Sequence, residues 1–213
     1  MDLFDYMREN ALRQEAPLAV RMRPQSLEEI AGQAHILGKD KLLYRAVKAD
    51  AVGSMILYGP PGCGKTTIAE VISRETQSDF CRLNATTAGK KEMEEVIQRA
   101  KENFGRGRRT TLFVDEIHRF HKGQQDFLLP YVEDGTIALI GATTENPFFE
   151  VNAALLSRSR IFELKPLAAA DIAALLRRAM ADKERGYGNW SAELTEEACA
   201  FLADAAAGDA RTA

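Results

Sequence analysis

One glycine-rich stretch, residues 59–66, limits what this chain can fold into more than any other. It reads Gly-Pro-Pro-Gly-Cys-Gly-Lys-Thr and fits the pattern G-x-x-x-x-G-K-[ST]. A short apolar run, 54–58, precedes it, and residues 65–72 carry apolar side chains at helical spacing. A strand, a glycine loop and a helix in this order cradle phosphate, because the loop N–H groups and the helix N-terminus both attract anions. The alternative, a glycine-rich turn that fits by chance, does not explain the flanking elements.

Each residue type in this loop predicts a role. Lys65 is expected to reach the β- and γ-phosphates of a nucleoside triphosphate, and the hydroxyl of Thr66 to ligate Mg²⁺. Cys63 is expected to fill space, and a thiol sensor is the alternative. The loop residues expected to hold the nucleotide are Pro61, Gly62, Cys63, Gly64, Lys65, Thr66 and Thr67.

Strand and helix patterns alternate along the rest of the first 165 residues. Strands are expected at 79–84, 110–116, 136–142 and 160–164, with helices at 91–103, 122–133 and 152–157. This alternation predicts an α/β fold with a parallel sheet covered on both faces. Ligands then sit at the carboxyl edge of the strands, so Lys65, Asp115 and Thr143 should surround one site.

An acidic pair ends the third predicted strand. Asp115 can hold Mg²⁺ through water, and the adjacent carboxylate of Glu116 can polarise an attacking water. The alternative is a pair of helix-capping acids. His118 and His121 follow, but no third metal ligand lies nearby, so they are not expected to hold a metal.

Two further sites can be interpreted in two ways from residue type alone. Thr143 and Thr144 follow the fourth strand, where a hydroxyl could contact the γ-phosphate or simply form part of a turn. Arg158 and Arg160 precede the last strand, and phosphoryl transfer gains from an arginine that faces the γ-phosphate, in cis or from a neighbour. The alternative for these arginines is a solvated turn.

Composition bounds the class of protein. The chain has 213 residues, 46% of them hydrophobic, which suffices for one sizeable core or for one domain plus part of another. The formal net charge is −3, so the chain has no overall basic excess that would indicate a nucleic-acid partner. Any contact with nucleic acid must come from a local basic patch. Three widely separated cysteines suit a reducing compartment, and no apolar run approaches the ~18 residues of a membrane span. A cytoplasmic protein is therefore expected.

The domain organisation is expected to have three parts. Residues 1–16 are predicted to be a mobile leader, 17–165 a nucleotide-binding core that begins with a strap, and 166–213 a small helical second domain. In this second domain, two alanine-rich helices are expected at 168–185 and 195–206, with Trp190 packed between them. The chain is expected to be a fragment of a longer protein.

The glycine loop together with Leu112-Phe113-Val114-Asp115-Glu116 resembles the AAA+ ATPases. Four further motifs resemble the RarA/MgsA family of replication-associated recombination ATPases, in the clamp-loader clade. They are Pro17-Leu18-Ala19-x-Arg21-Met22-Arg23-Pro24, Gly32-Gln33-x-His35, Asp115-Glu116-Ile117-His118-Arg119-Phe120 and Gly141-Ala142-Thr143-Thr144-Glu145-Asn146-Pro147. The resemblance implies an ATP hydrolase that uses Mg²⁺, with a five-stranded sheet in the order 5-1-4-3-2 followed by a helical lid, of which residues 166–213 would be part.

The resemblance also implies roles for individual residues. Arg23, Pro24, Ile30 and Gly32 would lie near the adenine. Lys65, Glu116, Thr143 as sensor 1, Arg158 as a finger acting on a neighbour's ATP and Arg211 as sensor 2 would form the catalytic set, and Thr66 and Asp115 would hold the metal.

The partners implied by the resemblance are DNA with forked or single-strand/double-strand junctions, further copies of the protein in a ring, and a single-strand-binding protein, at replication forks in the nucleoid. The candidate phosphate contacts are Lys90, Lys91, Arg106, Arg108, Arg109, Arg119 and Lys122. The rival functions are a protein-remodelling ATPase, a small-molecule kinase and a nucleotide-gated scaffold. The loop 86–90 has no aromatic residue, which disfavours a grip on polypeptide.

Overall fold

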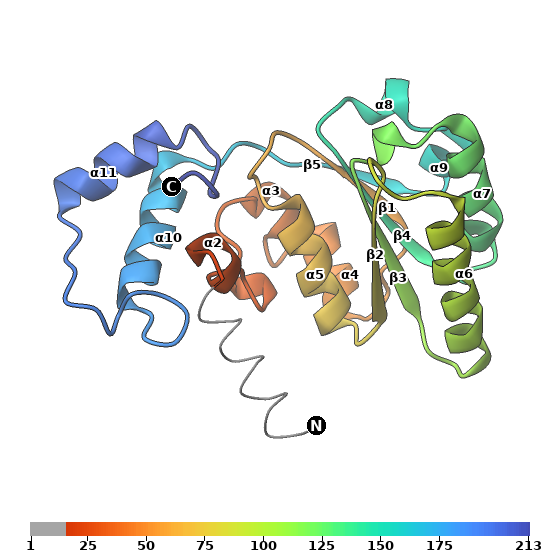
Figure 1. Cartoon of the computed structure of the whole chain (residues 1–213), viewed down its shortest axis with the longest axis horizontal. Coiled ribbons are helices and arrows are strands. Elements are labelled where there is room, and N and C mark those ends of the chain that lie inside the picture. Colours follow the sequence, from red (N-terminus) through yellow and green to blue (C-terminus); the bar gives the residue numbers. More distant parts are fainter. Residues whose placement is uncertain (1–15) are drawn as a thin grey trace.

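The computed structural model describes residues 16–213 (Figure 1). The leader predicted for the N-terminus therefore lies, apart from residue 16, outside the described residues. The core is a five-stranded sheet of β1 (Met55–Tyr58), β2 (Asp79–Asn84), β3 (Thr110–Asp115), β4 (Ala138–Thr143) and β5 (Arg160–Glu163). All neighbouring strands are parallel and their order is β2-β3-β4-β1-β5. The predicted fold class and strand order are confirmed.

Helices cover both faces of the sheet. On one face lie α4 (Leu42–Lys48) and α5 (Lys65–Glu75), and on the other lie α6 (Lys90–Gly105), α7 (Lys122–Glu133) and α9 (Ala153–Ser157), as Figure 1 shows. The interior strand β3 is consequently buried along five consecutive residues. A parallel strand between two layers of helices has no solvent face, which explains its continuous apolar sequence.

The predicted start of the fourth strand shifts for a local reason, whereas the helix predicted at 122–133 keeps its bounds. The fourth strand begins at Ala138 rather than at residue 136, because the N–H of Thr136 bonds the carboxylate of Asp134 and that of Ile137 bonds the Tyr131 carbonyl. Helix α7 runs through Pro130 to Glu133.

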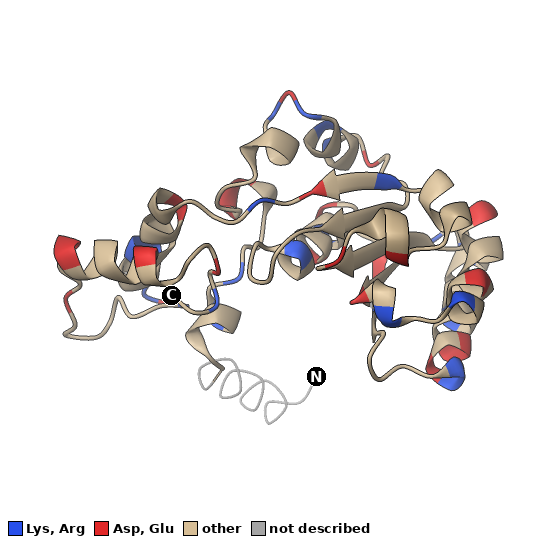
Figure 2. Cartoon of the chain, turned by 90° about the horizontal axis from the view of Figure 1, so that it is seen from above, with Lys and Arg blue, Asp and Glu red and all other residues tan. Residues whose placement is uncertain are grey.

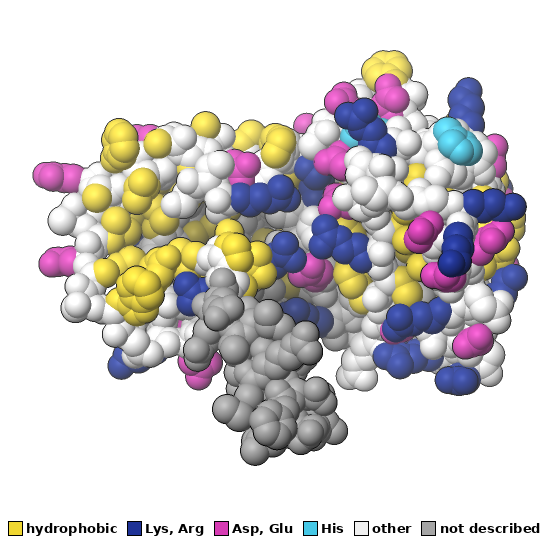
Figure 3. Space-filling view, viewed as in Figure 1, with side chains coloured by type: hydrophobic (Ala, Val, Ile, Leu, Met, Phe, Trp, Pro, Cys, Tyr) yellow, Lys and Arg dark blue, Asp and Glu magenta, His cyan; other side chains and the backbone are white. Residues whose placement is uncertain are grey.

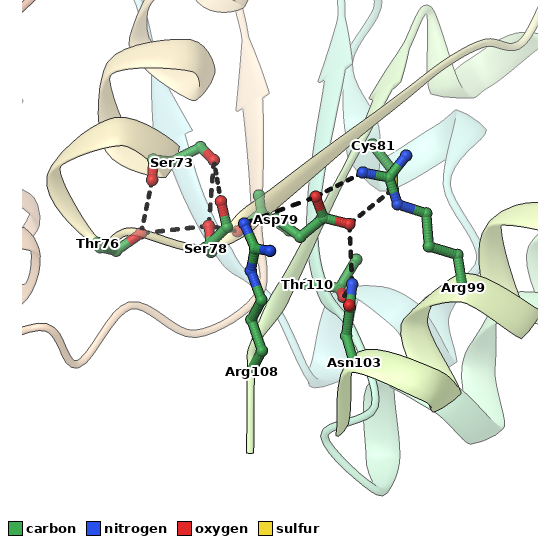
Figure 4. A network of polar contacts seen from close by, with 10 residues as sticks. Ser73, Thr76, Ser78, Asp79, Cys81, Arg99, Asn103, Arg108 and Thr110 are labelled. Atoms are coloured by element: carbon green, nitrogen blue, oxygen red, sulfur yellow. Dashed lines mark hydrogen bonds and ion pairs between the residues drawn. The ribbon is translucent and has the colours of Figure 1, made fainter. Parts of the chain in front are cut away.

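A polar network fixes the amino end of β2 (Figure 4). The buried carboxylate of Asp79 accepts hydrogen bonds from Arg99 and Asn103 on α6, at 2.6 and 2.8 Å. Burial would raise the pKa of Asp79, but these two donors outweigh it and hold the pKa below its usual range. The network ties α6 to the edge of the sheet opposite the glycine loop.

The segment before β1 lies between the sheet and the C-terminal helices (Figure 1) and consists of short helical turns. These are α2 (Leu18–Arg21), the 3₁₀ turn η1 (Leu27–Glu29) and α3 (Ala34–Leu37). We call residues 17–33 the strap. The side-chain amide of Gln33 fastens it, because Nε2 donates to the carbonyls of Cys63 (3.3 Å) and Lys165 (2.7 Å) and Oε1 accepts from the Lys165 N–H.

The C-terminal part, which we call the lid, pairs α10 (Ala169–Ala181) with α11 (Glu196–Ala205) around a small core of its own. The prediction that the first lid helix reaches residue 185 is wrong. It ends at Ala181 because the Asp182 carboxylate accepts from the N–H groups of Glu184 and Arg185. The prediction that Trp190 packs between the two helices is also wrong. Its side chain is 67% exposed and contacts Tyr187.

Hydrophobic side chains gather on the face of the lid seen in Figure 3, whereas basic and acidic side chains mix over the core. Across residues 16–213, the helices are all too short or too polar to cross a bilayer.

Candidate functional site

The glycine loop connects β1 to α5 and leaves an anion cradle at the start of that helix. Gly62 and Gly64 adopt φ values of +68° and +103°, which other residues rarely reach. Within the described residues no side chain caps α5, although the first N–H groups of a helix have no partner inside it. These donors and the helix dipole are suited to a phosphate group.

Lys65 begins α5 and is buried, with 8% of its surface exposed. Its Nζ donates to the carbonyls of Gly59 (2.7 Å) and Pro60 (2.8 Å), so the side chain folds back over the loop. Burial lowers the pKa of Lys65, while the nearby charges of Glu116 and Asp115 act in the opposite direction. The ammonium thus lies at the cradle, where a phosphate could replace the two carbonyls as its partner.

A pocket of about 490 Å³ adjoins the cradle, and three parts of the chain line it. The loop contributes Gly62 to Thr67, the strap contributes Arg23, Pro24 and Ile30 among others, and the lid contributes α10 and the segment around Arg211. A volume of this size fits a nucleotide-sized ligand. The mostly apolar strap and lid residues would surround the base, and the loop would face the phosphates.

Two residues expected at the nucleotide lie outside this lining. Pro61 is in the loop but does not line the pocket, and neither does Gly32. Gly32 has a φ of +66°, and a Cβ there would come within 2.7 Å of Leu167 and 3.0 Å of Asp171. Gly32 therefore allows the strap to pass close to the start of the lid.

The ends of β1, β3 and β4 bring the other predicted residues together. Thr143, fully buried, is paired in register with Tyr58, and its carbonyl accepts from the N–H of Gly59 at 3.2 Å. Asp115 ends β3, and its carboxylate accepts from Arg82 at 3.0 Å. Glu116 follows in the left-handed region, with φ of +52°. The carboxyl edge thus holds two carboxylates and a buried hydroxyl beside the glycine loop.

The donors available for a cation are few and of one kind. The hydroxyl of Thr66, buried at the start of α5, and the carboxylate of Asp115 are hard oxygen donors. No group of three or more His, Cys, Asp or Glu that could hold a metal occurs in residues 16–213. This set fits Mg²⁺, which keeps much of its water and takes substrate phosphates as ligands, better than a metal that needs a full protein cage.

Arg158 and Arg211 occupy different places. Arg211 lines the pocket, and the neighbouring Asp209 lies against Gly62. Arg158 follows α9 and does not line it; its guanidinium contacts Glu133 at 2.5 Å and the Ala154 carbonyl at 3.0 Å. Arg158 is therefore not available to the pocket of its own chain in this arrangement.

The candidate DNA contacts do not form one patch, and Figure 2 shows Lys and Arg positions interspersed with Asp and Glu over the molecule. Lys90 and Lys91 begin α6 and pair with Glu94 and Glu95, whereas the three arginines of 106–109 follow its other end. A helix of this length spans about 24 Å. Arg109 also pairs with Asp50, and Arg108 lies 4.0 Å from Asp79. Arg119 and Lys122 lie near the carboxyl edge, on η2 (Ile117–Arg119) and at the start of α7.

Sequence reasoning missed three polar residues at the site. Gln33 fastens the strap, Arg82 pairs with Asp115, and His118 lies between Glu116 and Thr143. The Gly-Gln pair signalled the first, since a polar residue in an apolar strap needs partners. Nothing in the sequence spacing signalled that Arg82 would contact Asp115, or that His118 would contact Thr143.

Comparison with known proteins agrees with this geometry. The model of the "ATPase family associated with various cellular activities (AAA)" matches residues 55–167. Replication-associated recombination protein A of Escherichia coli K12 is 55% identical over 197 residues, which is 92% of this chain and 44% of that protein, and the Bacillus subtilis protein of the same name is 48% identical. The chain spans less than half the length of these relatives.

Among solved structures, the Thermotoga maritima RuvB Holliday junction branch migration motor superposes with a TM-score of 0.71. The two are 28% identical, and the match covers 90% of this chain and 62% of that one.

Proposed function

We propose that this chain, which belongs to the AAA family of ATPases, hydrolyses ATP to drive a DNA-processing step in replication-associated recombination. The observation that carries the proposal is the convergence of Lys65, Glu116 and Thr143, from the carboxyl ends of three different strands or just after them, beside a pocket lined by strap and lid. The likeness to replication-associated recombination protein A and to a branch migration motor supports a DNA substrate.

In this proposal the chain's residues divide the work at the triphosphate. The loop N–H groups and Lys65 bind the phosphates, and Arg23, Pro24 and Ile30 surround the base. Thr66 and Asp115 hold Mg²⁺, which supplies neutralisation of phosphate charge. Glu116 accepts a proton from the attacking water.

Two groups sense the γ-phosphate. Thr143 lies next to the loop, because its backbone carbonyl accepts from the Gly59 N–H, and Arg211 lines the pocket from the lid. Arg158 serves as the finger for a neighbouring copy, because it lies outside its own pocket on an exposed turn. A closed ring of copies would supply one such arginine to each site.

The substrate proposed is forked DNA or a single-strand/double-strand junction in the cytoplasm, at the nucleoid, with a single-strand-binding protein as a further partner. Arg119 and Lys122 lie toward the carboxyl edge of the sheet and are the stronger phosphate-contact candidates, because Lys90, Lys91, Arg108 and Arg109 engage acids. The absence of an aromatic side chain in the loop 86–90 argues against a protein-remodelling role.

The decisive experiment measures ATP turnover with and without forked DNA, for the wild type, Glu116→Gln and Arg158→Ala, in this chain and in a protein of the relatives' full length. Stimulation by the fork, and loss of turnover in both variants, supports the proposal. Turnover that DNA leaves unchanged contradicts the DNA role, and an Arg158→Ala variant as active as wild type contradicts the trans finger.

A further inference from the structure

His118 lies between Glu116 and Thr143, two groups of the proposed site. It belongs to η2, directly after β3, and only 8% of its side chain is exposed. Its Nδ1 is 2.9 Å from the Thr143 hydroxyl and 3.3 Å from a carboxylate oxygen of Glu116. One ring nitrogen thus touches a residue of β4 and the residue that follows β3.

The backbone around His118 is built to place it there. Glu116 adopts φ of +52°, an unusual conformation for a residue with a side chain, and its carbonyl accepts from the Arg119 N–H at 2.8 Å. The buried Ile117 packs against Gly141 of β4, where a Cβ would lie 2.9 Å from it. Because Gly141 and Thr143 share a face of the strand, this close approach brings the imidazole to Thr143.

The hydrogen-bond inventory selects one arrangement of protons. The Thr143 oxygen already accepts from the N–H of Glu145 at 3.0 Å. If His118 Nδ1 carried no proton, its lone pair and the Glu116 carboxylate would face each other as two acceptors. No hydrogen bond could then form between them. With a proton on Nδ1, the imidazole donates to both Glu116 and Thr143.

This arrangement leaves the hydroxyl proton of Thr143 weakly engaged. Its nearest carbonyl acceptor is Glu145, at 3.4 Å. The proton is therefore available to a phosphate oxygen at the carboxyl edge. At the same time the Glu116 carboxylate is held at a fixed position relative to that hydroxyl.

We propose that His118 is a positioning residue that joins Glu116 to Thr143, so that phosphate contact at the threonine and orientation of the water-polarising carboxylate occur together. The inference rests on the proposed ATP hydrolysis and adds a residue that acts through both groups rather than on the nucleotide.

The test uses substitutions that separate the two ring nitrogens. Asn places an amide N–H near the position of Nδ1, Gln places one near Nε2, and Ala removes both. His118→Ala should lower kcat by about tenfold to a hundredfold, the range seen when residues that orient a ligand are lost. The Kd for a non-hydrolysable ATP analogue should change by less than about threefold, because the contact acts after binding. His118→Asn should recover most of the lost turnover and His118→Gln should not.

The matched control is His121→Asn. His121 is the neighbouring histidine at the N-cap of α7, where its Nδ1 accepts from the Gln124 N–H, and Asn is also a good cap. This variant should keep wild-type kcat. Equal losses in His118→Asn and His118→Gln, or a His118→Ala variant with unchanged kcat, would overturn the inference.

A second measurement needs no turnover and no nucleotide. The ¹⁵N signals of the imidazole report which ring nitrogen is protonated and hydrogen-bonded. In the free chain, Thr143→Val and Glu116→Gln should each shift the Nδ1 signal of His118 and leave that of His121 in place. If neither variant moves the His118 signal, the bridge does not exist in solution. A wild type with these NMR responses but no ATP turnover would contradict the proposed function and leave the bridge standing.

Discussion

Asp209 of the lid lies against Gly62 of the phosphate loop, so closely that a side chain on Gly62 would overlap it. A Cβ built on Gly62 would collide with the Asp209 carboxylate and lie 2.8 Å from the Asp209 Cα. The Asp209 carboxylate also accepts from the N–H of Arg211 at 2.7 Å. Contact at the glycine therefore places Arg211 at the pocket.

Gly62→Ala is expected to weaken nucleotide binding at least about tenfold, or ~1.4 kcal/mol. The alanine would strain a backbone with φ of +68° and push the Asp209 segment away from the loop. Titration of a fluorescent ATP analogue measures the effect. Gly53→Ala is the matched control, because a Cβ there meets nothing within 4 Å. Equal affinities in the two variants would show that the lid does not close on the loop.

Gly141→Ala is expected to destabilise the fold by about 1–3 kcal/mol, as overpacking of a core does. Its Cβ would lie 2.7 Å from Ile56 and 2.9 Å from Ile117. Urea unfolding checks this, and Ile117→Val added to Gly141→Ala should restore part of the loss. Gly105→Ala, on α6 with open space around its Cβ, should not destabilise, so a similar cost at both glycines would contradict the packing argument.

The Asp79 network predicts a pH dependence of stability. The pKa of Asp79 in the folded chain is depressed, because donors on α6 outweigh the effect of burial. Its contribution is therefore present above the unfolded pKa of about 3.9 and is lost as pH falls through the folded value. Asp79→Asn should cost about 1–3 kcal/mol at neutral pH and progressively less below pH ~4.

Urea unfolding of wild type and Asp79→Asn between neutral and acidic pH measures this difference. Asp204→Asn, at an exposed position of α11, serves as the control and should stay within ~0.5 kcal/mol of wild type at neutral pH. A cost of Asp79→Asn that did not shrink in acid would contradict the assignment of the network to the ionised carboxylate.

The proposed composite site predicts that two inactive variants complement each other. Arg158→Ala retains Glu116, and Glu116→Gln retains Arg158, so a mixed ring contains some interfaces with both groups intact. Random mixing in equal amounts should restore roughly a quarter of wild-type turnover. The test is the steady-state ATPase rate of the mixture, compared with the rate of each variant alone. No recovery after subunit exchange would place the finger and the base in one chain.

The sequence predicted the sheet well, because its signals are local. The apolar runs of β1, β3 and β4, and the glycine loop, are each contained in a few consecutive residues. The same holds for Asp115 at its strand end. Strand order came from the family resemblance, since periodicity does not say which strands are neighbours.

The errors and omissions concern contacts between distant segments. The expectation that Trp190 packs between the lid helices failed because Asp182 ends α10 early and the chain then forms turns and bends up to residue 191. The division of the basic residues between the two ends of α6 follows from helix geometry, which a list of charges does not show. The position of His118 depends on the missing side chain of Gly141, in another strand.

The amide of Gln33 joins segments 132 residues apart in the chain. Closing so long a loop costs conformational entropy. This cost is offset only after the sheet has formed and the segment around Lys165, between β5 and the lid, is in place. The strap should therefore dock late in folding, after the glycine loop has its shape. The hydrogen bonds from Gln33 to Cys63 and Lys165 form only when both of these residues are in place. The strap, which would surround the base, can therefore dock only after the rest of the site has assembled.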